Sequence, residues 1–266
     1  MTLFWLARLT FLKLMAYRMR YVTGIATYAV FVGGQYCIWR EVYRVRGVES
    51  LEGLTLAQLG TYLAVGYAAR SAYFTNTDSE IAARFQSGDV TLDLLKPLGF
   101  HGQWLAQAAG ETAFRILFFA LPMSLVLVPL FGVLPPADGG WWQFPLLFLM
   151  AFWINAELNV LTGVLAFFLE DITGLMSLKR NLLMLLSGLM VPLHFLPHWL
   201  EQATLWLPFA CIGYWPMLGY LGELDGMRHP DVITVLALCV GWGVGLRALS
   251  TALWAGARRR LEVQGG

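Results

Sequence analysis

The sequence predicts an all-α, polytopic membrane protein. Of its 266 residues, 58% are hydrophobic and 14% are aromatic, whereas only 13% are charged. That charged fraction is about half the ~25% usual for soluble domains, so the chain has too few polar side chains to cover a surface exposed to water. The same composition excludes a disordered chain and a coiled coil. The composition likewise excludes a nucleic-acid-binding protein with a basic face, whereas the formal net charge of +1 says nothing about partners.

Segment 1–20 is predicted to be an amphipathic helix that lies in the membrane interface. Its basic residues Arg8 and Lys13 fall off the apolar face that carries Phe4 and Leu12, as in other interfacial helices. These charges also interrupt the apolar run, and no small-residue cleavage site follows it. We therefore do not expect a signal peptide.

Six stretches with few charges are long enough to cross a bilayer, which takes roughly 20 apolar residues. The predicted spans are residues 21–39, 54–74, 116–134, 141–169, 173–196 and 232–257. With six spans, most basic residues fall on the side of the two termini, and the other side holds Arg40, Arg44, Arg46 and Arg228. Because cytoplasmic loops are enriched in Lys and Arg, both termini are predicted to be cytoplasmic.

Residues 202–222 are also uncharged and long enough to span, but they are predicted not to cross. The stretch contains Pro208 and Pro216 together with glycines and several Trp and Tyr residues. Helix breakers mixed with interfacial aromatics favour short re-entrant helices at the outer boundary. A seventh span would also export the arginines at 258–260, against the usual charge bias. We therefore expect short outer helices between spans five and six.

The inner segment between spans two and three, residues 75–110, is long and polar. Asp78 or Ser79 is expected to cap a helix that runs through Phe85, and Gly88 is expected to end it. A short leucine-rich stretch follows. Such a structured elbow suits either a docking site for another protein or a loop packed on its own spans, and the residues leave both possibilities open.

Ionisable residues within the spans are costly unless they are paired or hydrated. Glu157 lies in span four with Asn155 and Asn159. These three residues line a polar substrate path, contact a partner subunit or reach the inner interface, and the sequence does not choose among these roles. Glu111 and Arg115 are four residues apart at the start of span three and are expected to pair along one helix face.

Span six carries a glycine pattern, Gly241-Trp-Gly243-Val-Gly245, inside an apolar run. This location favours close helix packing through Gly241 and Gly245 over a dinucleotide-binding motif. Arg247 of the same span, and Arg70 of span two, are expected to extend their stems toward the inner headgroups.

Motifs for nucleotide binding or hydrolysis are absent from the sequence: there is no GxxxxGK[ST], HExxH or GxSxG. His194 and His198 are four residues apart, but they are expected at the outer water boundary rather than on a metal. Cys37, Cys211 and Cys239 have no metal or disulfide spacing and are expected to be packing residues.

Two segments carry a family resemblance. SGDVTLDLLKPL at 87–98 and SGLMVPLHFLPHWLEQATLWLPF at 187–209 resemble signatures of the ABC-2 type transporter permeases, specifically a bacterial six-span group, and the resemblance extends over nearly the whole chain. It implies a permease subunit in the bacterial cytoplasmic (inner) membrane that exports an amphipathic or lipid-like compound such as a drug, a natural product or a lipid-linked molecule. Such a subunit forms a homodimer or pairs with a sister permease, and ATP and Mg bind to a separate ATPase, with no cofactor on this chain.

The resemblance also implies one transmembrane domain over 1–266, divided into an interfacial helix at 1–20, spans one and two at 21–75, a cytoplasmic coupling loop at 76–102, spans three to six at 103–257 and a tail at 258–266. The coupling loop would contact the ATPase. The candidate contacts are Glu80, Arg84, Asp89, Asp93 and Lys96.

Two alternatives belong to other functional classes. One is a non-transporting membrane partner that uses the inner loop to recruit or regulate a cytoplasmic protein. The other is a membrane-embedded enzyme, in which Glu157 and the pair His194 and His198 would be catalytic. An enzyme of that kind would be indifferent to added ATP.

Overall fold

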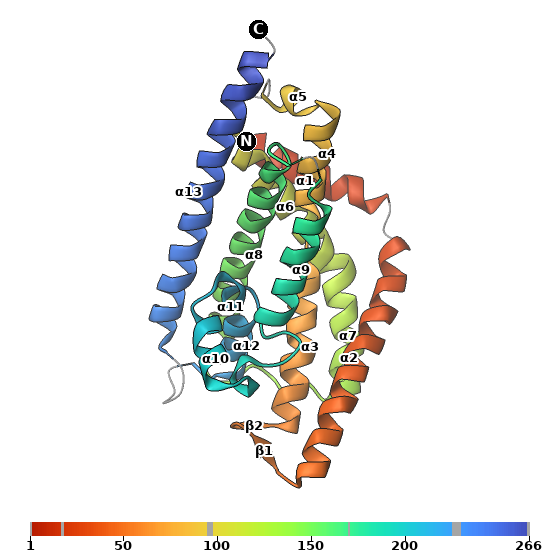
Figure 1. Cartoon of the computed structure of the whole chain (residues 1–266). Coiled ribbons are helices and arrows are strands. Elements are labelled where there is room, and N and C mark those ends of the chain that lie inside the picture. Colours follow the sequence, from red (N-terminus) through yellow and green to blue (C-terminus); the bar gives the residue numbers. More distant parts are fainter. Residues whose placement is uncertain (1, 17–18, 95–97, 170, 225–229, 265–266) are drawn as a thin grey trace.

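The computed structural model describes residues 2–16, 19–94, 98–169, 171–224 and 230–264. Within these residues the chain forms an elongated bundle of long helices with short helices packed at its side (Figure 1). The long helices are α2 (Met19–Arg46), α3 (Leu56–Tyr73), α8 (Gly140–Leu165) and α13 (Val232–Gln264), together with the continuous segment α6–η1–α7. The all-α expectation is therefore confirmed.

Helix α8 forms the centre of the bundle, where it packs against α13, α4 (Thr77–Ser87) and α12 (Tyr214–Leu221). Its side chains are buried on nearly every face along the second half of the helix, including Ile154, Glu157 and Val160. A helix that is apolar all round is suited to such a position. The charge of Glu157 therefore needs a partner inside the protein.

The third predicted span is part of a longer helix. It starts at Phe100 as α6 (Phe100–Arg115), widens into a π-helical turn, η1 (Ile116–Ala120), and continues as α7 (Leu121–Phe131). Pro122 follows η1; it lacks an amide hydrogen, and its ring would collide with the carbonyl four residues earlier in a regular helix. The wider turn relieves that conflict.

Three helical segments among the described residues are long and apolar enough to cross a membrane: Phe100–Phe131, Gly140–Leu165 and Val232–Arg259. The predicted span at 173–196 is wrong as a continuous helix, because α9 (Thr173–Leu186) ends after 14 residues. At 1.5 Å per residue it is roughly 21 Å long, shorter than the ~30 Å hydrocarbon core. The count of six spans stays a prediction.

Between α9 and α13 the chain forms short helices, which the sequence predicts only for residues 202–222. They are η2 (Leu193–Phe195), α10 (His198–Leu205), α11 (Pro208–Ile212) and α12. The hydroxyl of Tyr62 on α3 donates to the Gly188 carbonyl at 2.8 Å, and that of Tyr73 donates to the Ile212 carbonyl at 2.6 Å. These bonds satisfy carbonyls that the broken helices leave unpaired.

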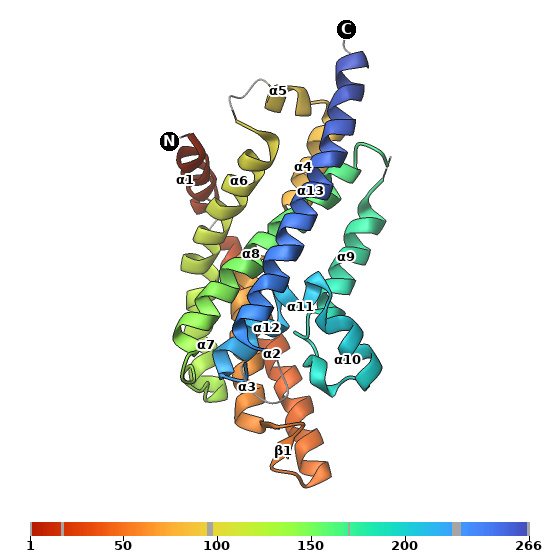
Figure 2. The same cartoon turned by 90° about the vertical axis from the view of Figure 1, so that its left-hand side faces the viewer.

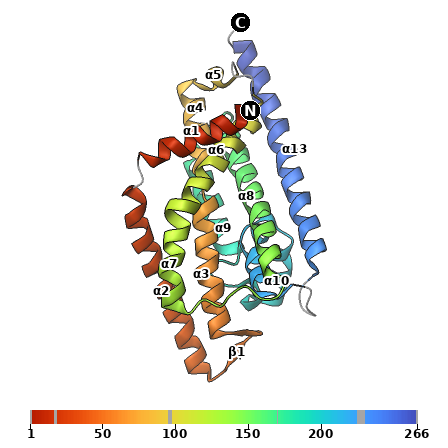
Figure 3. The ribbon, with the colours of Figure 1, turned by 180° about the vertical axis from the view of Figure 1, so that it is seen from behind.

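One end of the bundle gathers α1 (Thr2–Met15), α4, α5 (Val90–Leu94) and the last turns of α13, whereas the β1–β2 hairpin (Ser50–Leu51 and Leu54–Thr55) lies at the opposite end (Figures 1 and 2). Helix α1 has no buried residue and lies across α6 at a steep angle to the bundle (Figure 3). The elbow and the two terminal helices thus share one end, as the predicted topology requires.

The expected glycine contact in α13 is wrong in its position. Gly241 and Gly245 have no atom within 4 Å of where a Cβ would stand, whereas a Cβ at Gly243 would meet the ring of Trp153 on α8 at 2.5 Å. The glycine that permits close packing within this chain is therefore Gly243. The rotation of α13 about its axis, which composition does not fix, decides between these positions.

Candidate functional site: the elbow and its attachment to the bundle

The elbow consists of α4 and α5, joined by a turn at Gly88. Gly88 ends α4 with a φ of 78°, a left-handed conformation that glycine adopts at low cost, so the predicted helix end is confirmed. The predicted cap is wrong: Asn76 precedes the helix, and Asp78 lies in its first turn. The Asp78 carboxylate instead points to Lys179 on α9.

An internal ion pair holds α5 against α4. Arg84 Nη1 lies 2.8 Å from Asp93 Oδ1, and the guanidinium lies 5.6 Å from the centre of the Trp104 ring. The Asp93 side chain is buried, and its backbone carbonyl accepts a hydrogen bond from Gln103 Nε2 at 3.1 Å. Arg84 and Asp93, two of the predicted ATPase contacts, therefore bind each other.

The other described candidates, Glu80 and Asp89, are both exposed; Glu80 lies in the first turn of α4 and Asp89 follows Gly88 at its other end. Leu92 of α5 has 55% of its surface exposed. Lys96, the fifth candidate, lies outside the described residues. The described part of the elbow thus exposes two carboxylates, one at each end of α4, and the apolar side chain of Leu92.

A small apolar core lies beneath the elbow. Ile81 of α4 packs directly against Gly163 of α8, where a Cβ would meet Ile81 Cβ at 2.6 Å. Phe100 stacks on Trp254 of α13 with ring centres 3.9 Å apart. The full cluster comprises Ile81, Val90, Phe100, Trp104, Val160, Val164, Trp254 and Ala257. The elbow is therefore packed onto the bundle instead of hanging from it.

A buried polar cluster ties the start of the elbow to α8 and α9. Lys179 Nζ donates to Asp78 Oδ2 at 2.5 Å and to Asn159 Oδ1 at 2.6 Å. Asn159 Nδ2 donates to Thr75 Oγ1 at 3.1 Å, and Asn155 Nδ2 donates to the Tyr73 carbonyl at 2.8 Å. The two asparagines thereby satisfy groups where α3 ends, which have no partner within the helix.

Glu157, the third predicted path residue, pairs with α13. Arg247 Nε lies 3.3 Å from Glu157 Oε1, and the carboxylate is 2% exposed. The expectation that Arg247 extends to the headgroups is wrong, because its guanidinium pairs with Glu157, whose buried carboxylate would otherwise have no countercharge. Asn155, Glu157 and Asn159 all contact protein groups, which favours a role in holding the helices over direct contact with substrate.

The remaining expectations about single residues have mixed outcomes. Glu111 and Arg115 do pair, at 2.8 Å. Arg70 lies over the ring of Phe74 at 5.0 Å. His194 is buried, and its ring shares a hydrogen bond of 3.0 Å with the Tyr214 hydroxyl, so its predicted place at the water boundary is wrong. His198 is exposed.

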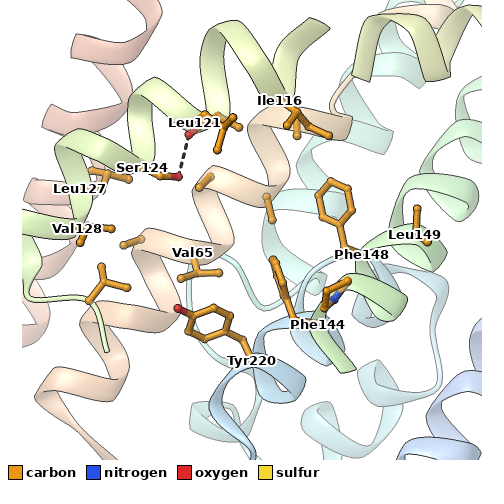
Figure 4. Close-up of a pocket in the computed structure, with 17 residues that line it drawn as sticks. Val65, Ile116, Leu121, Ser124, Leu127, Val128, Phe144, Phe148, Leu149 and Tyr220 are labelled. Carbon is orange, nitrogen blue, oxygen red and sulfur yellow. Dashed lines mark hydrogen bonds between the residues drawn. The ribbon is translucent and has the colours of Figure 1, made fainter. Parts of the chain in front are cut away.

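An apolar cavity of about 500 Å³ opens between α3, η1–α7 and α8 (Figure 4). Its walls are carbon-rich, from residues such as Val65, Leu127 and Phe148. The Ser124 hydroxyl on its wall donates to the Ala120 carbonyl at 2.8 Å, and the Tyr220 hydroxyl donates to the Leu134 carbonyl at 3.0 Å. Because these polar groups are already bonded, the cavity suits an apolar occupant.

The apolar helices and the packed elbow define a multi-pass membrane protein with a structured element at one end. A family model described as "ABC-2 family transporter protein" matches residues 29–265. The chain therefore belongs to the ABC-2 family of transporter proteins, and it is a permease component of an ABC transporter. No curated protein matches the chain.

Proposed function

We propose that this permease exports an amphipathic or lipid-like compound across the bacterial inner membrane, driven by ATP hydrolysis on a separate ATPase that docks on the elbow. It works as a homodimer or with a sister permease, and both termini face the cytoplasm. The observation that carries the proposal is that the elbow has exposed charges on its surface and is also attached to the bundle. Its carboxylates Glu80 and Asp89 are exposed, while Ile81 and Asp78 fix it to the bundle.

That attachment supports transmission of movement from an ATPase to the membrane helices. The Arg84–Asp93 pair makes α4 and α5 one unit, and the Ile81–Gly163 contact joins this unit to α8. The Lys179–Asp78 pair joins it to α9. A displaced elbow would therefore carry α8 and α9 with it. ATP biases the cycle by binding one conformation of the assembly more tightly than the other.

The apolar cavity supports a substrate with a hydrocarbon portion. A ligand that presents hydrogen-bonding groups would find the hydroxyls of Ser124 and Tyr220 already engaged, so its polar groups would lose water without compensation. An acyl chain or a fused-ring hydrocarbon would lose no such bonds.

The test is co-purification of the permease in nanodiscs with candidate ATPases, followed by measurement of ATP hydrolysis. Glu80→Arg and Asp89→Arg should each weaken the complex, because they reverse an exposed charge on the elbow. Glu49→Arg is the matched control, since Glu49 is exposed next to the hairpin at the opposite end. If no ATPase binds, or if all three variants behave alike, the proposal fails and recruitment of another cytoplasmic protein becomes the better explanation.

A further inference from the structure

A second, polar pocket of about 600 Å³ lies where α1 meets α4 and α6, at the same end of the bundle as the elbow. Its residues come from four separate elements: α1, α2, the α3–α4 connection with α4, and α6–η1. Helix α1 fits closely against α6 because Gly110 has no side chain. A Cβ at this position would collide with the backbone carbonyl of Ala7. The pocket is therefore formed by the docking of α1.

The pocket carries both signs of charge. Lys13 and Arg115 supply cations, and Glu80 and Glu111 supply carboxylates. Arg115 and Glu111 neutralise each other through a bond of 2.8 Å, and their side chains are only 12% and 15% exposed. Lys13 and Glu80 are exposed, and among the residues that the structure describes no ion pair joins them to each other. An ammonium and a carboxylate thus remain available to a ligand on different walls.

The neutral part of the lining is also divided. Thr10, Thr77 and Gln107 add hydrogen-bonding groups, while Leu9, Leu14 and Phe119 add apolar surface. Leu9 and Leu14 belong to α1, and Phe119 belongs to the π-helical turn of the segment α6–η1–α7, so apolar surface lies on two walls of the pocket. π-Helical turns occur frequently at functional sites. A ligand with a charged head and an apolar body matches this division.

We propose that this pocket binds the headgroup of a zwitterionic phospholipid that carries a primary amine, such as phosphatidylethanolamine. The phosphate lies near Lys13, and the ammonium donates hydrogen bonds to the Glu80 carboxylate. The glycerol and the first methylenes lie against the apolar residues Leu9, Leu14 and Phe119. Charge-assisted hydrogen bonds to phosphate and to carboxylate give the strongest polar contacts available here. The described lining residues balance in charge, which favours a zwitterion over an anionic lipid.

The experiment uses the purified full-length permease in detergent, without any ATPase. Dioctanoyl phosphatidylethanolamine, dioctanoyl phosphatidylglycerol and soluble phosphorylethanolamine are titrated separately, and the shift in Tm is followed by tryptophan fluorescence. Dioctanoyl phosphatidylethanolamine should give a saturable rise in Tm at the lowest concentration. Lys13→Gln should weaken its apparent affinity about tenfold, whereas Lys13→Arg should retain it. Glu80→Gln should remove the preference over dioctanoyl phosphatidylglycerol.

Lys13 and Glu80 are exposed, so these variants should fold, and unchanged circular dichroism checks this. Arg44→Gln, at the opposite end of α2, is the control variant and should bind as the original chain does. Equal or tighter binding of phosphatidylglycerol by the original chain, or unaltered binding by Lys13→Gln, would overturn the proposal. Equally tight binding of phosphorylethanolamine would replace the lipid with a soluble phosphate ester. Because no ATPase is present, failure here leaves the transport function untouched.

Discussion

Lys179 on α9 donates to the carboxylate of Asp78 on α4 at 2.5 Å, although 101 residues separate the two along the chain. Their side chains are only 11% and 10% exposed, so each charge depends on the other to offset the loss of water. The bond joins the first turn of the elbow to a bundle helix. Any movement that separates α4 from α9 must break it.

Removal of one partner of this pair should be strongly destabilising. Asp78→Ala leaves the Lys179 ammonium buried without its carboxylate and should lower the free energy of unfolding by about 3 kcal/mol. The double variant Asp78→Leu with Lys179→Met removes both charges and should recover part of the loss. Thermal unfolding in detergent measures both effects.

The control for this prediction is the exposed pair of Arg44 and Glu41 on α2, which should contribute no measurable stability. Additive losses from Asp78→Ala and Lys179→Ala in a double-mutant cycle would contradict the prediction, because they would show that the two side chains do not act together.

The contact of Gly163 with Ile81 should be sensitive to a single methyl group. Gly163→Ala places a Cβ 2.6 Å from Ile81 Cβ and must displace α4. Overpacking of this kind costs about 1–3 kcal/mol, against a gain of up to about 1 kcal/mol in helix propensity. We expect a lower Tm and weaker stimulation of ATP hydrolysis by substrate.

Gly174→Ala is the matched control, since no atom lies within 4 Å of its Cβ position on α9. It should be neutral or slightly stabilising. If both alanine variants unfolded at the same temperature as the original chain, α4 would not be seated on α8 as described.

Substitutions of the two elbow aspartates should have different effects: one should change local stability and the other should change ATPase binding. Asp93 is buried against Arg84, whereas Asp89 is exposed. Asp93→Asn weakens a hydrogen bond between charged groups, worth about 1.5–3 kcal/mol, and should speed hydrogen exchange of the α5 amides about tenfold or more. Asp89→Asn should leave exchange unchanged and weaken ATPase binding. The reverse pattern would show that Asp93 is the docking residue.

The pair of Glu157 and Arg247 should be structural. Arg247→Met leaves the Glu157 carboxylate, which is 2% exposed, without its cation and should lower the Tm. Adding Glu157→Gln should restore most of the lost Tm, because the buried group is then neutral. Glu157→Gln alone should keep both stability and substrate-stimulated ATP hydrolysis. Loss of stimulation at unchanged stability would instead assign Glu157 to the substrate path.

Hydropathy and helix breakers along the chain predicted much of the architecture. They indicated the membrane class, the long helices and the end of α4 at Gly88. They also indicated that prolines and glycines would break the region around Pro208 and Pro216 into short helices. Each of these properties depends on residues close together in sequence, so a local pattern is enough to specify it. Two sequence motifs likewise indicated the family, which the match over 29–265 confirmed.

Only the tertiary structure decided which side chains meet. The sequence named Asp78 as a helix cap, Arg247 as a residue extended to the headgroups and Gly241 as a packing site, but the folded chain pairs Asp78 with Lys179, pairs Arg247 with Glu157 and packs Gly243 on α8. Which side chains meet depends on the rotation of each helix about its own axis and on its depth within the bundle. Both are set by packing against all neighbouring helices at once, and a local sequence pattern does not contain that information.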